Sequence, residues 1–156
     1  PIVFDPNVRG SVMNDRAKYA AAVEKWVSIS SVVKVSDDDI AWLYPTDSLD
    51  VVAHRWIDAG VSCVVITRSA NGLIGFTANG MEEVEGARVN VVDTVGAGDT
   101  VGAIVVEGII KHSVHGLQGQ VLNALLQRGA IAAGITCSRA GAQPPRAHEL
   151  IDAMEK

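Results

Sequence analysis

The sequence contains only two cysteines, Cys63 and Cys137, which lie far apart in apolar stretches. Neither a CxxC pair nor a Cys/His spacing indicates a zinc site. The simplest interpretation is that both residues are small apolar side chains buried in a protein of a reducing compartment. We therefore expect a cytoplasmic location.

The sequence also has no long hydrophobic run and no excess of basic residues. Its longest apolar stretch, around residues 101–110, is interrupted by Glu107 and is too short to span a bilayer. The chain has 13 Lys and Arg against 18 Asp and Glu, so its formal net charge is -5. With no basic surplus to neutralise phosphates, we expect neither a nucleic-acid nor a membrane partner. This charge fits a protein that meets small molecules.

The composition is that of a folded chain. Of 156 residues, 48% are hydrophobic and 20% are charged, which excludes a disordered protein. This length suits one domain or a piece of a larger one. The sequence opens with Pro1-Ile2-Val3, an apolar run without an initiator Met that is typical of a buried strand. We expect that it starts inside a longer parent protein.

The first half of the sequence alternates strand and helix patterns. β-Branched or apolar runs predict strands at 2–5, 31–35 and 62–67. Helical spacing and capping residues predict helices at 16–29, from Ser36 to about Leu43, and from a cap at Asp47 or Ser48 to Asp58. This alternation predicts right-handed crossovers and a parallel sheet.

The second half adds a hairpin and then helices. Residues 73–77 and 81–91 alternate around Asn79-Gly80, which predicts an antiparallel hairpin. Helices are predicted from Ala97 or Asp99 to His112, over 117–138 and over 146–155. The fold class is therefore α/β, with a mostly parallel sheet flanked by helices and an antiparallel hairpin. Residues 1–156 form one domain in this interpretation.

The most informative segment is the loop that precedes the helix ending at His112. Gly96, Ala97 and Gly98 let main-chain N–H groups point into open space. At a helix N-terminus these groups are unpaired and lie at the positive end of the helix dipole, which is a geometry that holds an anion. Asp99 falls beside the same space, where its carboxylate can accept a proton from an attacking hydroxyl.

Three interpretations of this loop remain open on the residues alone. The first is a plain glycine turn, with Asp99 as a favourable charge at the helix start. The second is a dinucleotide-binding loop, but Gly96, Gly98 and Gly102 give a spacing one residue longer than the usual pattern. The third is phosphoryl transfer, with an anion hole beside a base.

Residues 93–99 read Asp-Thr-Val-Gly-Ala-Gly-Asp, which resembles the carboxy-terminal signature D-T-x-G-A-G-D of the PfkB, or ribokinase-like, carbohydrate kinases. Four further segments resemble the fructokinase branch of that family in order and spacing: Asp5–Arg9, Lys34–Asp39, Val65–Gly72 and Ile135–Pro145. The resemblance covers essentially the whole chain and implies a ribokinase-like fold.

The resemblance implies an ATP-dependent transfer of a phosphoryl group to a sugar hydroxyl, most specifically that of fructose. In this family the last Asp of the signature is the catalytic base, which corresponds to Asp99. The amides of Gly96, Ala97 and Gly98 would form the anion hole. Ribose, 2-keto-3-deoxygluconate and nucleosides remain open as acceptors.

The resemblance also implies a nucleotide site. Thr67 falls where a family strand ends at the nucleotide phosphates, and Gly72 falls in the turn that follows. The family usually has Gly where this chain has Ser69, whose hydroxyl could donate to phosphate instead. Lys34 and Ser36 belong to the segment that organises magnesium and phosphate. On the residues alone, Ser36 and Asp39 are equally well a helix-capping pair.

Metal and sugar ligands follow from the same resemblance. Asp39 is expected to take part in binding Mg²⁺, and Asp93 is the candidate ligand of K⁺, although it could equally be a turn carboxylate. Asn7 and Arg9 follow the first strand, at the sheet edge where ligands gather in open α/β folds. We expect both of them in the substrate site, where Arg9 suits a phosphate or sugar contact, although Arg9 could instead be a solvated surface residue.

The amino-terminal half of the family fold has no counterpart in this sequence. That half carries most sugar contacts, a glycine-pair signature and a small β-sheet lid that often mediates dimerisation. We therefore expect a carboxy-terminal portion of the fold that binds ATP–Mg²⁺ weakly and has little activity alone, from a parent that forms homodimers. The alternative function is a non-catalytic nucleotide- or sugar-sensing module.

Overall fold

The strands follow one another across a single five-stranded sheet in the order β1-β2-β3-β4-β5. The computed structural model describes residues 1–13 and 15–155. The strands are β1 (Val3–Phe4), β2 (Val32–Ser36), β3 (Cys63–Thr67), β4 (Leu73–Thr77) and β5 (Gly80–Val84). Pairing is parallel from β1 to β3 and antiparallel on both sides of β4, so β4 alone runs against the others. The mixed sheet and its hairpin are thus confirmed.

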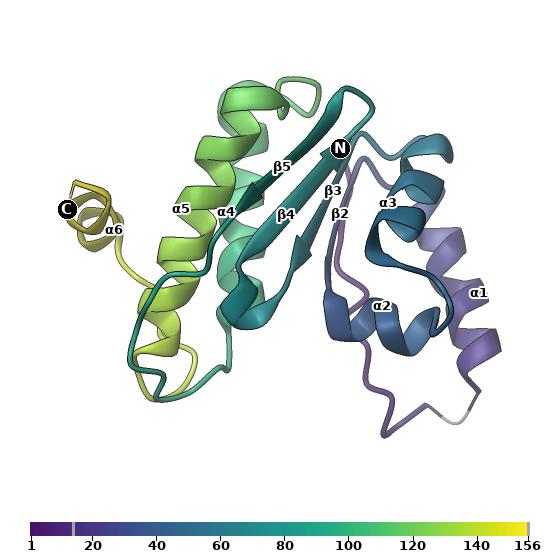
Figure 1. Cartoon of the computed structure of the whole chain (residues 1–156), viewed down its shortest axis with the longest axis horizontal. Coiled ribbons are helices and arrows are strands. Elements are labelled where there is room, and N and C mark those ends of the chain that lie inside the picture. The colour runs from purple at the N-terminus through teal and green to yellow at the C-terminus, as the bar shows by residue number, and fades with distance from the viewer. Residues whose placement is uncertain (14, 156) are drawn as a thin grey trace.

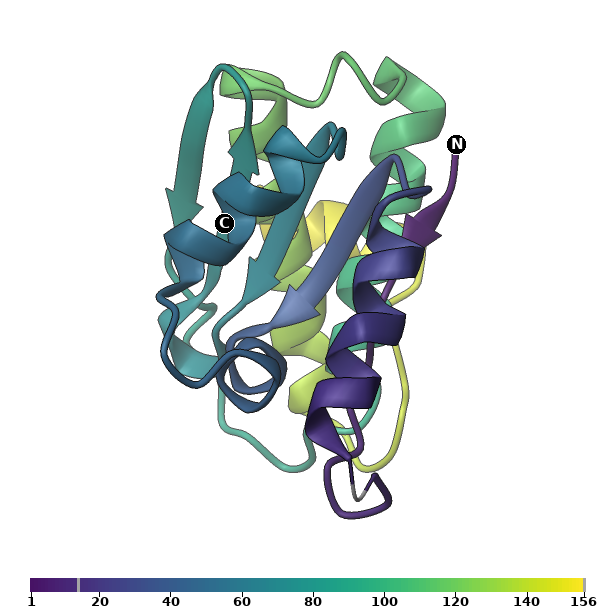
Figure 2. The ribbon, with the colours of Figure 1, turned by 90° about the vertical axis from the view of Figure 1, so that its right-hand side faces the viewer.

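Helices cover both faces of the sheet (Figures 1 and 2). On one face lie α1 (Arg16–Val27), α2 (Asp37–Leu43) and α3 (Leu49–Asp58), which are the crossovers between the parallel strands. On the other face lie α4 (Ala97–His112) and α5 (Gly119–Cys137), with α6 (Ala147–Met154) beyond α5. Both crossovers cover the same face, as right-handed connections between successive strands require.

Strand β2 supplies side chains to both layers because successive residues point to opposite faces. Val33 and Val35 belong to the apolar cluster under α1–α3, whereas Val32 belongs to the cluster under α4 and α5. Lys34 shares the face of Val32 and is only 5% exposed. A cation at that depth is costly unless it is paired, and the partner of Lys34 is Asp5.

The predicted strand over 81–91 was too long. β5 ends at Val84, and the chain from Glu85 to Gly96 follows the carboxyl-terminal end of α5 instead. Val92 N donates to the carbonyl of Cys137 over 2.8 Å, and Val91 and Val92 are exposed. The alternating valines therefore belong to a segment that is held by a helix end and that pairs with no strand in the described part of the chain.

Smaller boundary errors have local causes. Helix α5 begins at Gly119 and not at residue 117 as predicted. Leu117 is buried, but it lies ahead of the helix. The hairpin loop consists of Ala78 and Asn79, with Gly80 already paired to Thr77.

Cys63 is buried as expected, but Cys137 is only partly buried. Among the helices that the structure describes, none combines the length and the apolar character needed to cross a bilayer.

Candidate functional site

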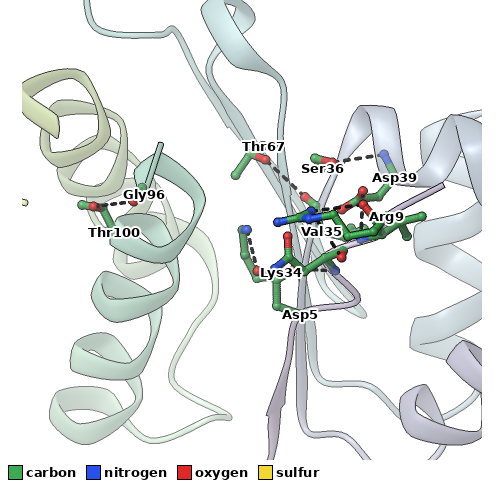
Figure 3. A network of polar contacts seen from close by, with 11 residues as sticks. Asp5, Arg9, Lys34, Val35, Ser36, Asp39, Thr67, Gly96 and Thr100 are labelled. Atoms are coloured by element: carbon green, nitrogen blue, oxygen red, sulfur yellow. Dashed lines mark hydrogen bonds and ion pairs between the residues drawn. The ribbon is translucent and has the colours of Figure 1, made fainter. Parts of the chain in front are cut away.

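Three strand ends and one helix start meet at the same edge of the sheet. The carboxyl ends of β1, β2 and β3 lie at the lower side of Figure 1, where α4 begins. Figure 3 shows the side chains of this edge, with Asp5, Lys34, Ser36 and Thr67 on the strand side and Gly96 at the start of α4. The topology thus gathers segments that are far apart in the sequence.

Gly96 is the N-cap of α4 and has a φ of 82°, in the left-handed region that favours glycine. A Cβ at this position would also lie 2.7 Å from the Cβ of Ala142. Both the backbone conformation and the close neighbour therefore require glycine here, and no side chain caps the helix.

Asp93 fixes the loop that leads to this helix start. One carboxylate oxygen accepts from the N–H of Val95 over 3.0 Å, and the other accepts from the N–H of Gly141 over 2.9 Å. These main-chain donors hold the pKa of Asp93 below its ordinary value, because they stabilise the charged form. The predicted K⁺ ligand is therefore already engaged as a clamp between two loops.

A buried pair of hydroxyl groups fixes the first turn of α4 itself. Thr100 Oγ1 donates to the carbonyl of Gly96 over 2.8 Å and lies 2.9 Å from Thr136 Oγ1 on α5. Thr136 Oγ1 in turn donates to the carbonyl of Ala132 over 3.0 Å. The glycine loop is thus anchored to α5 as well as to the loop that follows it.

The amides assigned to the anion hole are not equivalent. Ala97 N donates to the carbonyl of Thr94 over 3.2 Å, so this amide is used within the turn. For the N–H groups of Gly98 and Asp99, residues 1–13 and 15–155 provide no acceptor. The N–H of Gly96 likewise has no acceptor among these residues, so Gly96, Gly98 and Asp99 have the open amides of the helix start, and Asp99 is exposed.

The side chain of Lys34 extends from β2 toward the start of α4. Its Nζ atom lies 2.8 Å from Asp5 Oδ2, and the Lys34 side chain is 7% exposed. A Cβ at Gly98 would lie 2.8 Å from this Nζ atom, so the absence of a side chain at Gly98 leaves room for the ammonium group. A buried cation thus lies beside the helix start that carries the open amides.

Ser36 and Asp39 form the capping pair at the start of α2. Ser36 is the N-cap, and its Oγ accepts from the N–H of Asp39 over 3.0 Å. Asp39 Oδ1 accepts from the N–H of Val8 over 3.2 Å. Burial raises the pKa of the Asp39 carboxyl, an effect that the Ser36 contacts partly offset. The capping interpretation is confirmed, and a role for both residues near phosphate stays a prediction.

The turn after β3 has an unusual backbone. Thr67 ends the strand, and its Oγ1 lies 3.5 Å from the carbonyl of Val35. Ser69 has a φ of 50°, which is a conformation that glycine adopts at lower cost. Gly72 has a φ of 84°, and a Cβ there would lie 2.0 Å from the carbonyl oxygen of Val84. Packing against the end of β5 therefore suffices to explain Gly72.

Asn7 and Arg9 lie in the exposed segment after β1. Asn7 has a φ of 43°, and its N–H donates to Asp5 Oδ1 over 3.2 Å. The Arg9 guanidinium donates to the carbonyl of Val8 over 3.1 Å and so folds back on its own backbone. Figure 3 shows Arg9 at the same edge as Lys34, and contact of Asn7 and Arg9 with a sugar stays a prediction.

The acidic residues of the described chain do not form a metal site by themselves. No group of three or more His, Cys, Asp or Glu side chains with metal-binding geometry occurs in residues 1–13 and 15–155. Asp39 is half-buried at the strand edge, whereas Asp93 is turned toward Gly141. This fits Mg²⁺, which keeps its waters and is often bound through one or two carboxylates plus substrate phosphates.

Asp5, Thr100 and Thr136 were missed as site residues by the reasoning from sequence. From the sequence, Asp5 was identified only as the first residue of the segment Asp5–Arg9. A carboxylate that directly follows one strand, with a lysine in the next strand, is a signal that could have identified it. The two threonines stand in apolar helical patterns, and only their contact in space identifies them.

Comparisons with known proteins identify the family of the chain. A family model described as pfkB family carbohydrate kinase matches residues 2–149. A fructokinase from Rhizobium leguminosarum bv. trifolii is 39% identical over 99 residues, which are 64% of this chain and 30% of that protein. Fructokinase-2 of Oryza sativa subsp. japonica is 33% identical over 145 residues, which cover 90% of this chain and 42% of that protein.

Two solved structures have the same fold. A fructokinase double mutant from Vibrio cholerae, in a form with fructose, ADP and potassium ion bound, has a TM-score of 0.82 at 25% identity and is covered to 49% by 96% of this chain. Aminoimidazole riboside kinase from Salmonella enterica, complexed with aminoimidazole riboside and an ATP analog, has a TM-score of 0.78 at 21% identity, with 99% of this chain covering 52% of that one.

The chain thus spans between 30% and 52% of the length of these four relatives. Its matched region nevertheless includes the glycine loop, the Lys34 segment and the turn after β3. On the extent of the family match and the agreement of the fold, this chain belongs to the pfkB family of carbohydrate kinases and has a ribokinase-like fold.

Proposed function

We propose that this chain supplies the phosphoryl-transfer half of a kinase that moves the γ-phosphoryl group of ATP to a sugar hydroxyl. The observation that carries the proposal is the start of α4, where the open amides of Gly96, Gly98 and Asp99 and the exposed Asp99 carboxylate lie beside a buried ammonium group. Fructose is the proposed acceptor, because fructokinases are prominent among the similar proteins.

The N–H groups of Gly98 and Asp99, together with Gly96, face the oxygens of the transferred phosphoryl group in this proposal. They are preorganised, since Asp93 and Thr100 fix the loop before any ligand arrives. Such donors stabilise charge that develops in the transition state, and loss of one typically costs about 10²- to 10³-fold in turnover. The Lys34 ammonium adds a full positive charge from below.

Asp99 is the proposed base. Its carboxylate takes the proton of the sugar hydroxyl as the hydroxyl oxygen forms a bond to the γ-phosphorus. The bond between that phosphorus and the β,γ-bridging oxygen breaks, and ADP leaves with the bond electrons. An exposed carboxylate beside the open helix start suits this role, because the acceptor must reach it from solvent.

Mg²⁺ would be held by the nucleotide phosphates with Asp39 nearby, and it would neutralise charge on the β- and γ-oxygens. Thr67 and Ser69 would contact the phosphates from the turn after β3, and Asn7 and Arg9 the sugar. A dependence of the activity on K⁺ would act through Asp93, which joins the two loops.

The test uses this chain in place of the matching segment of the rhizobial fructokinase, so that the rest of the fold is supplied. Asp99→Asn is expected to lower fructose-dependent ATP turnover by about 10²- to 10⁴-fold, because the base is lost. ATP–Mg²⁺ binding should be retained. Asp38→Asn, which removes an exposed carboxylate at the start of α2, is the matched control and should leave turnover unchanged.

Turnover that survives Asp99→Asn would reject the base assignment. A chimera that binds ATP–Mg²⁺ but has no turnover even with Asp99 would favour a non-catalytic sensing module. The chain alone is expected to bind ATP–Mg²⁺ weakly and to show little turnover in a coupled assay. Parallel assays with ribose and 2-keto-3-deoxygluconate would identify the acceptor.

A further inference from the structure

We infer that Asp5 is a positioning residue, which holds the ammonium group of Lys34 beneath Gly98 and so sets where this charge meets phosphate. The inference deepens the proposed function and rests on it for the identity of the ligand. It is built on two independent observations, the Asp5–Lys34 ion pair and the space left at Gly98.

The ion pair is a neighbour pair across parallel strands. Phe4 of β1 is in register with Val33 of β2, so the next residues along the two strands are Asp5 and Lys34. Asp5 Oδ2 lies 2.8 Å from Lys34 Nζ and accepts a hydrogen bond from it. The pairing of the strands therefore places the carboxylate before any ligand is present.

Asp5 is itself held in place. Its second oxygen accepts from the N–H of Asn7 over 3.2 Å. The carbonyl of Pro6 accepts from the Tyr19 hydroxyl on α1 over 3.1 Å, and the N–H of Val8 donates to Asp39. The segment from Asp5 to Val8 is thus fixed at three points, and Asp5 is a rigid anchor for a long side chain.

Lys34 needs such an anchor. Its four-carbon stem is flexible, and an ammonium group can donate three hydrogen bonds. Asp5 receives one of these bonds, and residues 1–13 and 15–155 provide no acceptor for the other two. Because the side chain is 7% exposed, water has little access to these two donors. In this inference, an oxyanion bound at the start of α4 supplies the acceptor that these two donors lack.

Figure 3 shows the pair on the strand side of this edge, with the first turn of α4 on the other side. The Nζ atom would lie 2.8 Å from a Cβ at Gly98, so it occupies space that a side chain at this position would need. Without Asp5, the ammonium group would lose the contact that fixes this position. Asp5 therefore acts on phosphate only through Lys34.

The experiment measures the acetylation rate of each lysine in the whole chain by mass spectrometry, together with ATP–Mg²⁺ affinity by calorimetry. In Asp5→Asn, Lys34 should be acetylated roughly five- to thirtyfold faster, as expected for loss of one stabilising contact. The exposed Lys111, which pairs with Glu107, is the internal standard and should keep its rate. ATP–Mg²⁺ should bind about tenfold more weakly.

Two further variants separate positioning from folding. Asp5→Glu keeps the charge and should restore most of the slow acetylation of Lys34, whereas Asp38→Asn should match the unchanged chain. An unchanged Lys34 rate in Asp5→Asn would overturn the inference. A faster Lys34 rate with unaltered ATP–Mg²⁺ affinity would overturn it equally, because the position of the ammonium would then not matter to the ligand.

The proposed function can fail separately. If the unchanged chain binds no ATP–Mg²⁺ while Asp5→Asn still exposes Lys34, the nucleotide site is rejected, and the positioning of Lys34 by Asp5 is supported.

Discussion

Two helices start at the same edge of the sheet, and each carries an aspartate at its third helical position. At the start of α2, the hydroxyl of Ser36 caps the helix, and the half-buried Asp39 accepts from Val8. At the start of α4, a glycine takes the place of the capping side chain, and the exposed Asp99 follows amides without acceptors among the described residues. The first helix start has its donors satisfied within the protein, whereas the second keeps donors that the proposed phosphate site would use.

The two helix starts differ mainly in how their first N–H groups are satisfied. A serine N-cap stabilises a helix by using a donor that a ligand would otherwise need. Gly96 gives up this stabilisation, and the loop is held instead by Asp93 and by the Thr100–Thr136 contact. Stability at the α4 start therefore comes from behind the loop, which leaves its front face accessible.

The largest effect after loss of Asp99 is expected from filling the open start. Gly98→Ala places a Cβ 2.8 Å from Lys34 Nζ, so the ammonium group must move, and ATP–Mg²⁺ binding should weaken by about tenfold, as measured by calorimetry. Gly102→Ala is the matched control on the same helix, because a Cβ there meets nothing within 4 Å. It should raise the free energy of unfolding by about 1 kcal/mol and leave binding unchanged. Equal binding by both variants would contradict the open-start account.

An intermediate effect is expected from opening the satisfied start. Ser36→Ala removes the hydroxyl that accepts from Asp39 N, and should lower the free energy of unfolding by about 1 kcal/mol in urea titrations. Ser48 is the N-cap of α3 but makes no side-chain cap hydrogen bond, so Ser48→Ala should cost less. If the two variants lose equal stability, the cap at α2 contributes nothing specific.

The smallest effects concern pH, and they have opposite signs at the two predicted metal ligands. The folded pKa of Asp39 is raised by burial, so folding favours its protonated form, and the stability of the unchanged chain relative to Asp39→Asn should fall as pH rises above 3.8. The folded pKa of Asp93 is lowered by the N–H groups of Val95 and Gly141. Stability relative to Asp93→Asn should therefore decrease as pH falls below 3.8. Urea titrations between pH 3 and pH 7 measure both trends, and trends of the same sign would contradict the assigned contacts.

Much of the fold was predictable because local patterns and topology agree. The apolar runs of β2 and β3 identify strands buried on both faces, and the Gly80 turn identifies the hairpin. The end of β5 was not predictable, because the valines after Val84 alternate like a strand but are held by the carbonyl of Cys137. No pattern in the sequence reports that tertiary contact.

The site was predictable in its parts and unpredictable in its contacts. The spacing of Gly96, Gly98 and Asp99 identified an open helix start and a carboxylate. That Ala97 N is used within the turn, and that Gly98 accommodates Lys34, depends on distances in space. The proposed function of Asp5 likewise follows from the pairing register of β1 with β2. A strand of two residues has too short a sequence pattern for this register to be predicted.

The contact between Thr100 and Thr136 has a further consequence for this loop. Two hydroxyl hydrogens are shared among three contacts, to Gly96 O, to Ala132 O and between the two oxygens. The hydrogens can therefore be rearranged without displacement of any heavier atom, and Gly96 O keeps the N–H of Thr100 as a donor in either arrangement. If the proposed phosphate site is occupied, the hydroxyl dipoles behind the loop can therefore reorient toward the bound anion while the heavier atoms keep their positions.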